Sequence, residues 1–297
     1  MIEKTLMNMT IEEKIGQLVV FGFNGIEIND HVESLIKDKK TGNIILFGRN
    51  VKSSEQLYNL NKSLQKLAME TTGIPLFICI DQEGGMVIRI KQGATYFPGA
   101  MTLTATNDPN NSYKTGKLMG QELKALGINM DLAPDLDINN NPYNPVIGVR
   151  SFGDDVKKVT ENGVAWIKGL QESIIATAKH FPGHGDTKVD SHLDLPRIDK
   201  SLHDLETFEL KPFIAAIENG VDCIMSAHIN FPALTEEGRP TTLSHNCLTG
   251  YLREKLGFKG LIVTDCMEME AIHTYYTTPK GALMALEAGA DIVMVSH

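Results

Sequence analysis

The most informative part of the sequence is a short apolar run that leads into a polar loop. The run reads Ser173-Ile174-Ile175-Ala176-Thr177-Ala178, and the loop continues as Lys179-His180-Phe181-Pro182-Gly183-His184-Gly185-Asp186-Thr187-Lys188-Val189-Asp190-Ser191-His192. A run of this kind predicts a buried β-strand. The loop holds two glycines, one proline, three histidines and two aspartates, and histidines beside carboxylates titrate near neutral pH. We therefore expect an active site at the end of this strand, in preference to a turn-rich surface loop.

Apolar runs of the same kind recur along the chain. They also occupy residues 18–23, 42–47, 75–80, 128–132, 221–226, 260–264 and 290–295. Several are continuously apolar, which is typical of parallel strands buried on both faces. Helical patterns lie between most of them, for example at residues 54–64, 205–219 and 278–287. Eight strands alternating with helices over 297 residues predict an α/β fold, a TIM (β/α)8 barrel rather than a doubly wound sheet.

Three local signals mark helix boundaries. Thr10 followed by Glu13 is a capping-box pattern and predicts the start of a helix. Gly220 predicts the end of the helix at residues 205–219. Pro212 lies inside that pattern, so it either starts a second helix or kinks the first.

Residues 1–297 are expected to form one catalytic barrel domain. The sequence ends directly after the eighth apolar run. We therefore expect either that the barrel lacks its final helix or that a further C-terminal segment or another chain covers the eighth strand.

The composition argues against some classes of partner. A formal net charge of −9 disfavours nucleic acid and anionic membranes. No secretory signal or stretch of membrane-spanning length is visible, so we expect a soluble, cytoplasmic protein, or a secreted one if a signal has been removed. The four cysteines form no Cys-x-x-C motif, and we expect them to be reduced thiols.

Side chains suited to chemistry follow the apolar runs at their C-terminal ends. They are Asp81, Lys179 with His180, His228 and Asp265. Barrel enzymes build their active sites at this end of the strands. We therefore expect these side chains to surround one site.

The candidate catalytic residues each have a functional and a structural interpretation. Asp265 can serve as a nucleophile, a base or a metal ligand, or as the N-cap of a following helix. Asp190 and His192 flank Ser191, and alternate residues of an extended loop point the same way. The carboxylate can then orient the imidazole for general acid/base catalysis, or the two can form a solvated pair.

Two arginines accompany the candidate carboxylates. Arg89 shortly follows Asp81, and the two can grip sugar hydroxyls or form a structural ion pair that closes a turn. Arg150 follows a segment rich in turn residues. It points either into the site or to the surface.

A metal site is a further interpretation of the polar loop. Ligands could come from His180, His184, Asp186, Asp190 and His192. Barrel metallohydrolases, however, usually present a His-x-His pair at an early strand, and the first three strand ends here carry no histidine. We therefore expect no metal and no other cofactor.

Four motifs carry a resemblance to a known family. They are Gly42-Asn43-Ile44-Ile45-Leu46-Phe47-Gly48-Arg49-Asn50, Asp81-Gln82-Glu83-Gly84-Gly85, Arg150-Ser151-Phe152-Gly153 and Asp190-Ser191-His192. At these residues the chain resembles glycoside hydrolase family 3, and within it the β-N-acetylglucosaminidases (β-hexosaminidases) of the NagZ type. The resemblance extends from Glu12 to Asp291. One departure is Met86, where the family often has arginine, and we expect it to affect the loop rather than the chemistry.

The resemblance implies roles for individual residues. Asp265 corresponds to the nucleophile, His192 to the acid/base and Asp190 to its partner. The residues that hold the terminal sugar correspond to Asp81, Arg89, Arg150, Lys179 and His180. In the family the Asp-Ser-His element replaces a glutamate acid/base that β-glucosidases take from a second domain.

The activity implied is that of a retaining exo-β-N-acetylglucosaminidase. Its substrates would carry a terminal β-linked N-acetylglucosamine, as in peptidoglycan-derived muropeptides or chitin fragments. Phosphorolysis at the same site is an alternative, because a histidine acid/base does not repel phosphate. Three further hypotheses are substrate-assisted catalysis with the clustered Asp131, Asp135 and Asp137, a metal-dependent amidohydrolase and a non-catalytic sugar-binding barrel.

Overall fold

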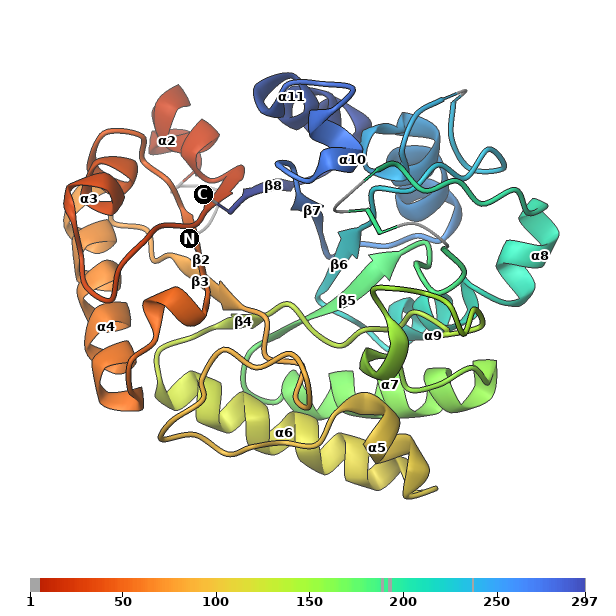
Figure 1. Ribbon diagram of the computed structural model, residues 1–297. Helices are drawn as coiled ribbons and strands as arrows, with labels where there is room; N and C mark the ends of the chain where they lie inside the picture. The colour runs from red at the N-terminus through yellow and green to blue at the C-terminus, as the bar shows by residue number, and fades with distance from the viewer. Residues whose placement is uncertain (1–5, 188–189, 192–193, 237, 297) are drawn as a thin grey trace.

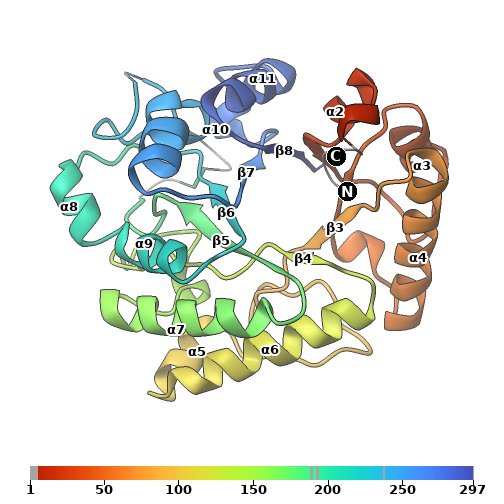
Figure 2. The same ribbon diagram turned by 180° about the vertical axis from the view of Figure 1, so that it is seen from behind.

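Eight parallel strands close into a barrel in the computed structural model, which describes residues 6–187, 190–191, 194–236 and 238–296. Each strand pairs with its neighbour in sequence, and β8 pairs with β1. Helices surround the barrel on the outside (Figures 1 and 2). The predicted TIM (β/α)8 barrel is therefore confirmed. Among the described residues, no helix is both long and apolar enough to span a membrane.

Every predicted apolar run contains one strand. The strands are β1 (Val19–Phe21), β2 (Asn43–Leu46), β3 (Phe77–Ile80), β4 (Met130–Asp131), β5 (Ile175–Phe181), β6 (Cys223–Ser226), β7 (Leu261–Cys266) and β8 (Ile292–Val295). Two of them extend beyond the predicted end. Lys179 and His180 belong to β5, and Asp265 belongs to β7, whereas the sequence predicted that they follow these strands. Backbone pairing continues past the apolar residues, since Leu136 donates its N–H to the carbonyl of Lys179.

The connecting helices agree with most of the predicted boundaries. They are α2 (Ile11–Gly16), α3 (Asp30–Lys37), α4 (Ser54–Thr71), α5 (Ala100–Ala105), α6 (Pro109–Ala125), α7 (Val156–Leu170), α8 (Leu202–Thr207), α9 (Lys211–Glu218), α10 (Glu270–His273) and α11 (Thr278–Ala288). Short 3-10 turns are η1 (Gly48–Asn50), η2 (Gly148–Arg150) and η3 (Thr241–Leu243), and η4 (Asn246–Lys255) is a π-helix.

The local helix signals are confirmed. The capping box of Thr10 and Glu13 is present at the start of α2. The predicted helix at residues 205–219 divides in two, and Pro212 occupies the first turn of the second helix, α9. Pro212 therefore starts a new helix and does not kink a single long one.

Side chains of the strands divide between two hydrophobic clusters. The inner cluster contains Val20, Ile45, Cys79, Met130, Leu132, Cys223, Met225, Val263, Ile292 and Met294. The outer cluster joins the alternate strand residues, such as Ile44 and Ile78, to the surrounding helices. Strands β2 and β6 are buried along their whole length, as the continuous apolar runs predicted. The four cysteines are free thiols.

Helices α6 and α7 pack against each other backbone to backbone, side by side beneath the barrel in both views (Figures 1 and 2). A Cβ atom on Gly169 would lie 2.1 Å from the carbonyl oxygen of Tyr113, and one on Gly116 would lie 2.3 Å from that of Trp166. No side chain can be accommodated at such distances without moving a helix. The two glycines therefore set the spacing of the helices that flank β4 and β5.

We expect Gly169→Ala to lower the free energy of unfolding by about 1 to 3 kcal/mol, because the helices must separate to admit the methyl group. Urea unfolding can be followed by the fluorescence of Trp166, the one tryptophan of the chain. Gly250→Ala is the matched control, since the nearest atom to its Cβ would lie 3.9 Å away. Equal stability of the two variants would contradict the proposed contact.

Candidate active site

A cavity of about 460 Å³ lies among the C-terminal ends of the barrel strands. Six of the predicted site residues line it: Asp81, Arg89, Arg150, Lys179, His180 and Asp265. Ser191 of the Asp-Ser-His element also lines the cavity. Asp190 is not among the lining residues, and His192 lies outside the residues that the structure describes. Of the predicted strand-end side chains, Asp81, Lys179, His180 and Asp265 line the cavity, whereas His228 is not among its lining residues.

An irregularity in β5 brings two consecutive side chains to the cavity. Successive residues of a strand normally point to opposite faces. The pairing of β5 with β6 shifts register between Ala178 and Phe181, and such irregularities re-aim side chains next to active sites. Lys179 and His180 consequently both line the cavity.

Lys179 is a buried cation held by two carboxylates. Its side chain is 2% exposed, and its Nζ lies 2.8 Å from Oδ1 of Asp81 and 2.6 Å from Oε1 of Glu83. Burial alone would lower the pKa of Lys179, but the charges of Asp81 and Glu83 outweigh burial and raise it above its ordinary value. The ammonium group is therefore a permanent charge of the site.

The ion pairs continue on both sides of Lys179. Arg89 contacts Oδ2 of Asp81 at 3.2 Å, and Arg150 donates two hydrogen bonds to Glu83, at 2.9 and 2.7 Å. The order of charges is Arg89, Asp81, Lys179, Glu83 and Arg150, and we call these residues the charge chain. Three cations and two anions give it a net charge of +1. Burial would raise the pKa of both carboxyls, but the cations hold the pKa of Asp81 and of Glu83 below their ordinary values.

The charge chain resolves two questions that the sequence left open. Asp81 and Arg89 do form an ion pair, and both also line the cavity. Arg150 points into the site rather than to the surface. Its guanidinium also lies 3.8 Å from Asp135, a fully buried carboxyl whose pKa burial raises well above the ordinary value.

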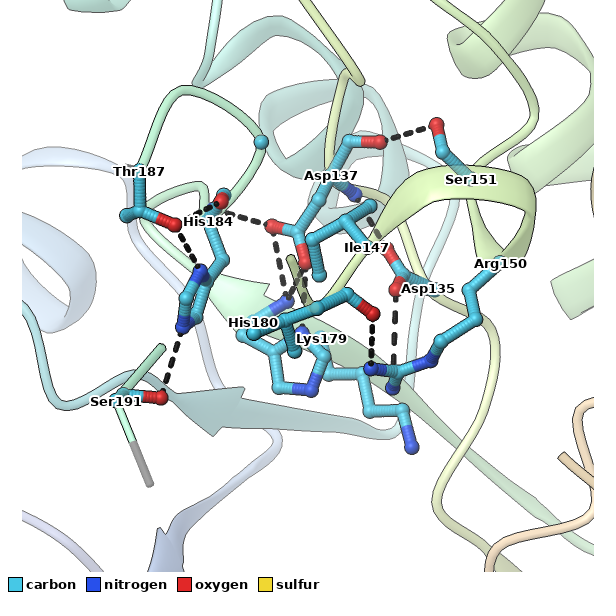
Figure 3. A network of polar contacts seen from close by, with 12 residues as sticks. Asp135, Asp137, Ile147, Arg150, Ser151, Lys179, His180, His184, Thr187 and Ser191 are labelled. Atoms are coloured by element: carbon cyan, nitrogen blue, oxygen red, sulfur yellow. Dashed lines mark hydrogen bonds and ion pairs between the residues drawn. The ribbon is translucent and has the colours of Figure 1, made fainter. Parts of the chain in front are cut away.

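Two histidines stand beside the charge chain, each held by hydrogen bonds (Figure 3). Nδ1 of His180 lies 2.6 Å from Oδ2 of Asp137. Nδ1 of His184 lies 2.8 Å from Oγ1 of Thr187, and its Nε2 lies 2.9 Å from Oγ of Ser191. Burial lowers the pKa of His180 to about 4 and that of His184 to about 3. Both imidazoles are therefore neutral at pH 7.

The hydrogen bonds of Thr187 indicate which ring nitrogen of His184 carries the proton. It donates to the carbonyl oxygen of His184 at 3.0 Å, so it accepts from the Nδ1–H of the same residue. Nε2 then accepts the hydroxyl hydrogen of Ser191. The hydrogen bond between Ser191 and His184 holds the middle residue of the Asp-Ser-His element in place.

Asp265 is a half-buried carboxylate on β7. Its Oδ1 accepts a hydrogen bond from the backbone N–H of Cys266 at 2.7 Å. The following helix, α10, begins at Glu270 and has Met269 as its N-cap, so the N-cap interpretation of Asp265 is wrong. His228, another predicted strand-end residue, is buried and donates from Nε2 to the carbonyl oxygen of Cys266 at 2.9 Å. This hydrogen bond holds the backbone of β7 in place directly after Asp265.

Among the residues that the structure describes, the metal ligands suggested by the sequence do not assemble into one group. Both ring nitrogens of His184 are engaged by hydroxyls, and Asp186 pairs with Lys200 at 2.7 Å. The structure instead brings Asp135, Asp137 and His180 close enough to hold an ion, all buried. Nδ1 of His180 is already hydrogen-bonded to Asp137 in that group, which explains their proximity without a metal.

Several residues of the cavity were not singled out by the sequence. They are Phe47, Arg49, Glu83, Glu268 and Glu270. Glu83 lies in the quoted motif Asp81-Gln82-Glu83, so its position two residues beyond Asp81 was the available signal. Its contact with Arg150 joins residues 67 positions apart, and nothing in the local pattern indicates that pairing.

Residues 10–297 match the family described as "Glycosyl hydrolase family 3 N terminal domain". The chain belongs to glycosyl hydrolase family 3. This match confirms the resemblance inferred from the four motifs.

The chain is similar to proteins named β-hexosaminidase and to solved structures of β-N-acetylglucosaminidases. It is 39% identical over 281 residues to "Beta-hexosaminidase A" of Pseudoalteromonas piscicida, covering 89% of this chain and 47% of the relative. A family 3 β-N-acetylglucosaminidase from Paenibacillus sp. str. FPU-7 has 49% identity and a TM-score of 0.96, over 97% of this chain and 55% of that chain. NagZ from Neisseria gonorrhoeae, solved with N-trifluoroacetyl-D-glucosamine, has 32% identity and a TM-score of 0.85, over 94% and 81%. The chain thus spans about half the length of the first two relatives and most of the third.

We expect Glu83→Gln to lower the free energy of unfolding by about 3 to 5 kcal/mol, because it removes a charge from a buried ion pair and leaves cations uncompensated. Thermal and urea unfolding at pH 7 would measure the change. Glu33→Gln is the matched control, because Glu33 pairs with Lys37 on the exposed surface of α3, where ion pairs contribute little. A loss of stability no larger than that of the control would contradict the role of Glu83.

Proposed function

We propose that the protein is a retaining exo-β-N-acetylglucosaminidase. It would release terminal non-reducing β-linked N-acetylglucosamine from peptidoglycan-derived muropeptides or chitin fragments. The observation that carries the proposal is the position of Asp265. Its carboxylate lines the same cavity as the charge chain and His180, so a group able to attack a sugar stands beside groups able to hold one.

The charge chain suits a polyhydroxylated ligand. A sugar hydroxyl both donates and accepts hydrogen bonds, and the cavity offers fixed donors on Lys179, Arg89 and Arg150 and an acceptor on Asp81. The ion pairs hold these groups in place before substrate arrives, which reduces the cost of ordering them. The relatives named β-hexosaminidase and β-N-acetylglucosaminidase support N-acetylglucosamine as the sugar.

The proposed reaction proceeds in two steps. Asp265 attacks the anomeric carbon while the glycosidic C–O bond breaks, and His192, oriented by Asp190, gives a proton to the leaving oxygen. In the second step His192 accepts a proton from water, which displaces Asp265 and restores the enzyme. These roles follow the family resemblance, and His192 lies outside the described residues.

The rival mechanisms have less support from the cavity. Substrate assistance needs an acidic pair at the substrate, but Asp131, Asp135 and Asp137 are buried and are not among the residues that line the cavity. Glu268 and Glu270 do line it, so a glutamate acid is the main rival to His192. A metal-dependent amidohydrolase would lose activity on chelation, and a non-catalytic sugar-binding barrel would bind without turnover.

We expect a slow 5-fluoro N-acetylglucosaminyl fluoride to label Asp265 covalently. Its 5-fluorine slows both steps, while its anomeric fluoride is a good leaving group that speeds formation of the glycosyl-enzyme. Peptide mapping by mass spectrometry would locate the adduct. Asp265→Asn should abolish labelling, while Glu268→Gln and Glu270→Gln should retain it. Continued cleavage of an aryl β-N-acetylglucosaminide without any adduct would contradict the covalent mechanism.

Product analysis separates the remaining activities in the same preparation. We expect free N-acetylglucosamine with and without phosphate, and unchanged activity in EDTA. A sugar 1-phosphate that appears only with phosphate would favour the phosphorylase activity instead.

We expect Ser191→Ala to reduce kcat about fivefold, since the hydrogen bond to His184 contributes about 1 kcal/mol to positioning the loop. The loss should be larger for a poor leaving group than for dinitrophenolate, which departs without a proton. Ser63→Ala, which removes an exposed hydroxyl of α4, is the control and should leave kcat unchanged. A loss independent of the leaving group would contradict a role for this bond in acid catalysis.

A further inference from the structure

Asp137 is a buried carboxylate that the proposed reaction does not use. It lies beyond β4, and three nitrogen atoms are within hydrogen-bond distance of its carboxyl oxygens (Figure 3). Its Oδ2 contacts Nδ1 of His180 at 2.6 Å and the backbone N–H of His180 at 3.2 Å. Its Oδ1 accepts from the backbone N–H of His184 at 2.6 Å. The two backbone groups can only donate, so the carboxyl group acts as an acceptor toward them.

These contacts determine where the proton of His180 resides. A carboxylate that accepts backbone N–H bonds also favours N–H at Nδ1 of the adjacent ring. Burial keeps His180 neutral, so a proton on Nδ1 leaves a lone pair on Nε2. In the part of the chain that the structure describes, no side chain hydrogen-bonds to Nε2, and the ring lines the cavity.

The neighbours of His180 in the cavity leave a bound hydroxyl in need of a hydrogen-bond acceptor. Lys179 and Arg150, which flank the ring, have donors and no acceptors. A hydroxyl placed between them receives hydrogen bonds on its oxygen but still needs an acceptor for its own hydrogen. Nε2 of His180 is such an acceptor, in addition to the carboxylate of Asp81.

We propose that Asp137 is a positioning residue that fixes His180 as the Nδ1–H tautomer, so that Nε2 accepts the hydrogen of one substrate hydroxyl. The site then recognises a hydroxyl by its hydrogen as well as by its oxygen. A substituent that accepts but cannot donate, such as fluorine, is rejected there. The identity of the ligand as a sugar rests on the proposed function, whereas the tautomer does not.

The tautomer can be measured directly by nuclear magnetic resonance. Protein labelled with ¹⁵N-histidine is studied without substrate at pH 7.5, above the pKa of Asp137, which burial raises to about 6. The ¹⁵N shifts of His180, assigned by their loss in His180→Gln, should show a protonated Nδ1 and an unprotonated Nε2. Asp137→Asn should shift the proton toward Nε2.

Ser151→Ala is the matched control for this variant. Ser151 donates to the backbone carbonyl of Asp137 at 2.5 Å, so its removal disturbs the same segment without changing the carboxylate. It should leave both nitrogen shifts of His180 as in the wild type. A shift of equal size in this control would overturn the assignment to the carboxylate.

Kinetics with modified substrates tests whether the site requires the hydrogen of one substrate hydroxyl. Aryl β-N-acetylglucosaminides carrying fluorine in place of the 3-, 4- or 6-hydroxyl are compared with the parent compound. At one position the wild type should lose about 5- to 150-fold in kcat/KM, the cost of a buried polar group without its partner. In Asp137→Asn this ratio should approach one, because an Nε2–H can donate to fluorine.

Protonated Nε2 in the wild type would overturn the proposal, even if Asp137→Asn does not fold. So would an unchanged ¹⁵N pattern in a folded Asp137→Asn protein, whatever its activity. If no aryl β-N-acetylglucosaminide is cleaved while the ¹⁵N results hold, the proposed function fails and the tautomer assignment stands. The two failures are therefore distinguishable.

Discussion

The ammonium group of Lys179 is the charge on which the site depends. A cation removed from water is costly unless carboxylates surround it, and Asp81 and Glu83 supply two. Each of these carboxylates then needs only one further cation, which Arg89 and Arg150 provide. One buried lysine on β5 thereby holds side chains that follow β3 and β4, and it makes this wall of the cavity rigid.

Burial and pairing divide the carboxyls of this barrel end into two kinds. Asp81 and Glu83 have cationic partners, and their pKa values lie below the ordinary range. Asp131 and Asp135 are buried with weaker compensation, and burial raises their pKa values well above it. Identical functional groups thus acquire lowered or raised pKa values according to their surroundings. The carboxyls with lowered pKa values face the cavity, while Asp131 and Asp135 are not among its lining residues.

The sequence predicted the barrel and most of the site, but not the pairings within it. Apolar runs locate the strands, and the position of Asp81 or Asp265 after such a run predicts the correct end of the barrel. Hydrophobicity cannot show that β5 continues through Lys179 and His180, because backbone pairing with neighbouring strands decides that. Contacts between distant segments, such as Glu83 with Arg150 or Asp137 with His180, leave no periodic signal. In the sequence Asp137 is therefore visible only as one of three clustered aspartates.

The pKa values of the two histidines that line the cavity also bear on the proton donor of the proposed reaction. His180 and His184 have pKa values of about 4 and 3, so neither carries an extra proton to donate at pH 7. General acid catalysis requires a group that is protonated near the working pH. His180 and His184 are therefore not the proton donor of the proposed reaction, which assigns that role to His192. The two neutral rings serve better as acceptors, His184 toward Ser191 and His180 toward the cavity, because neutrality leaves each ring a lone pair.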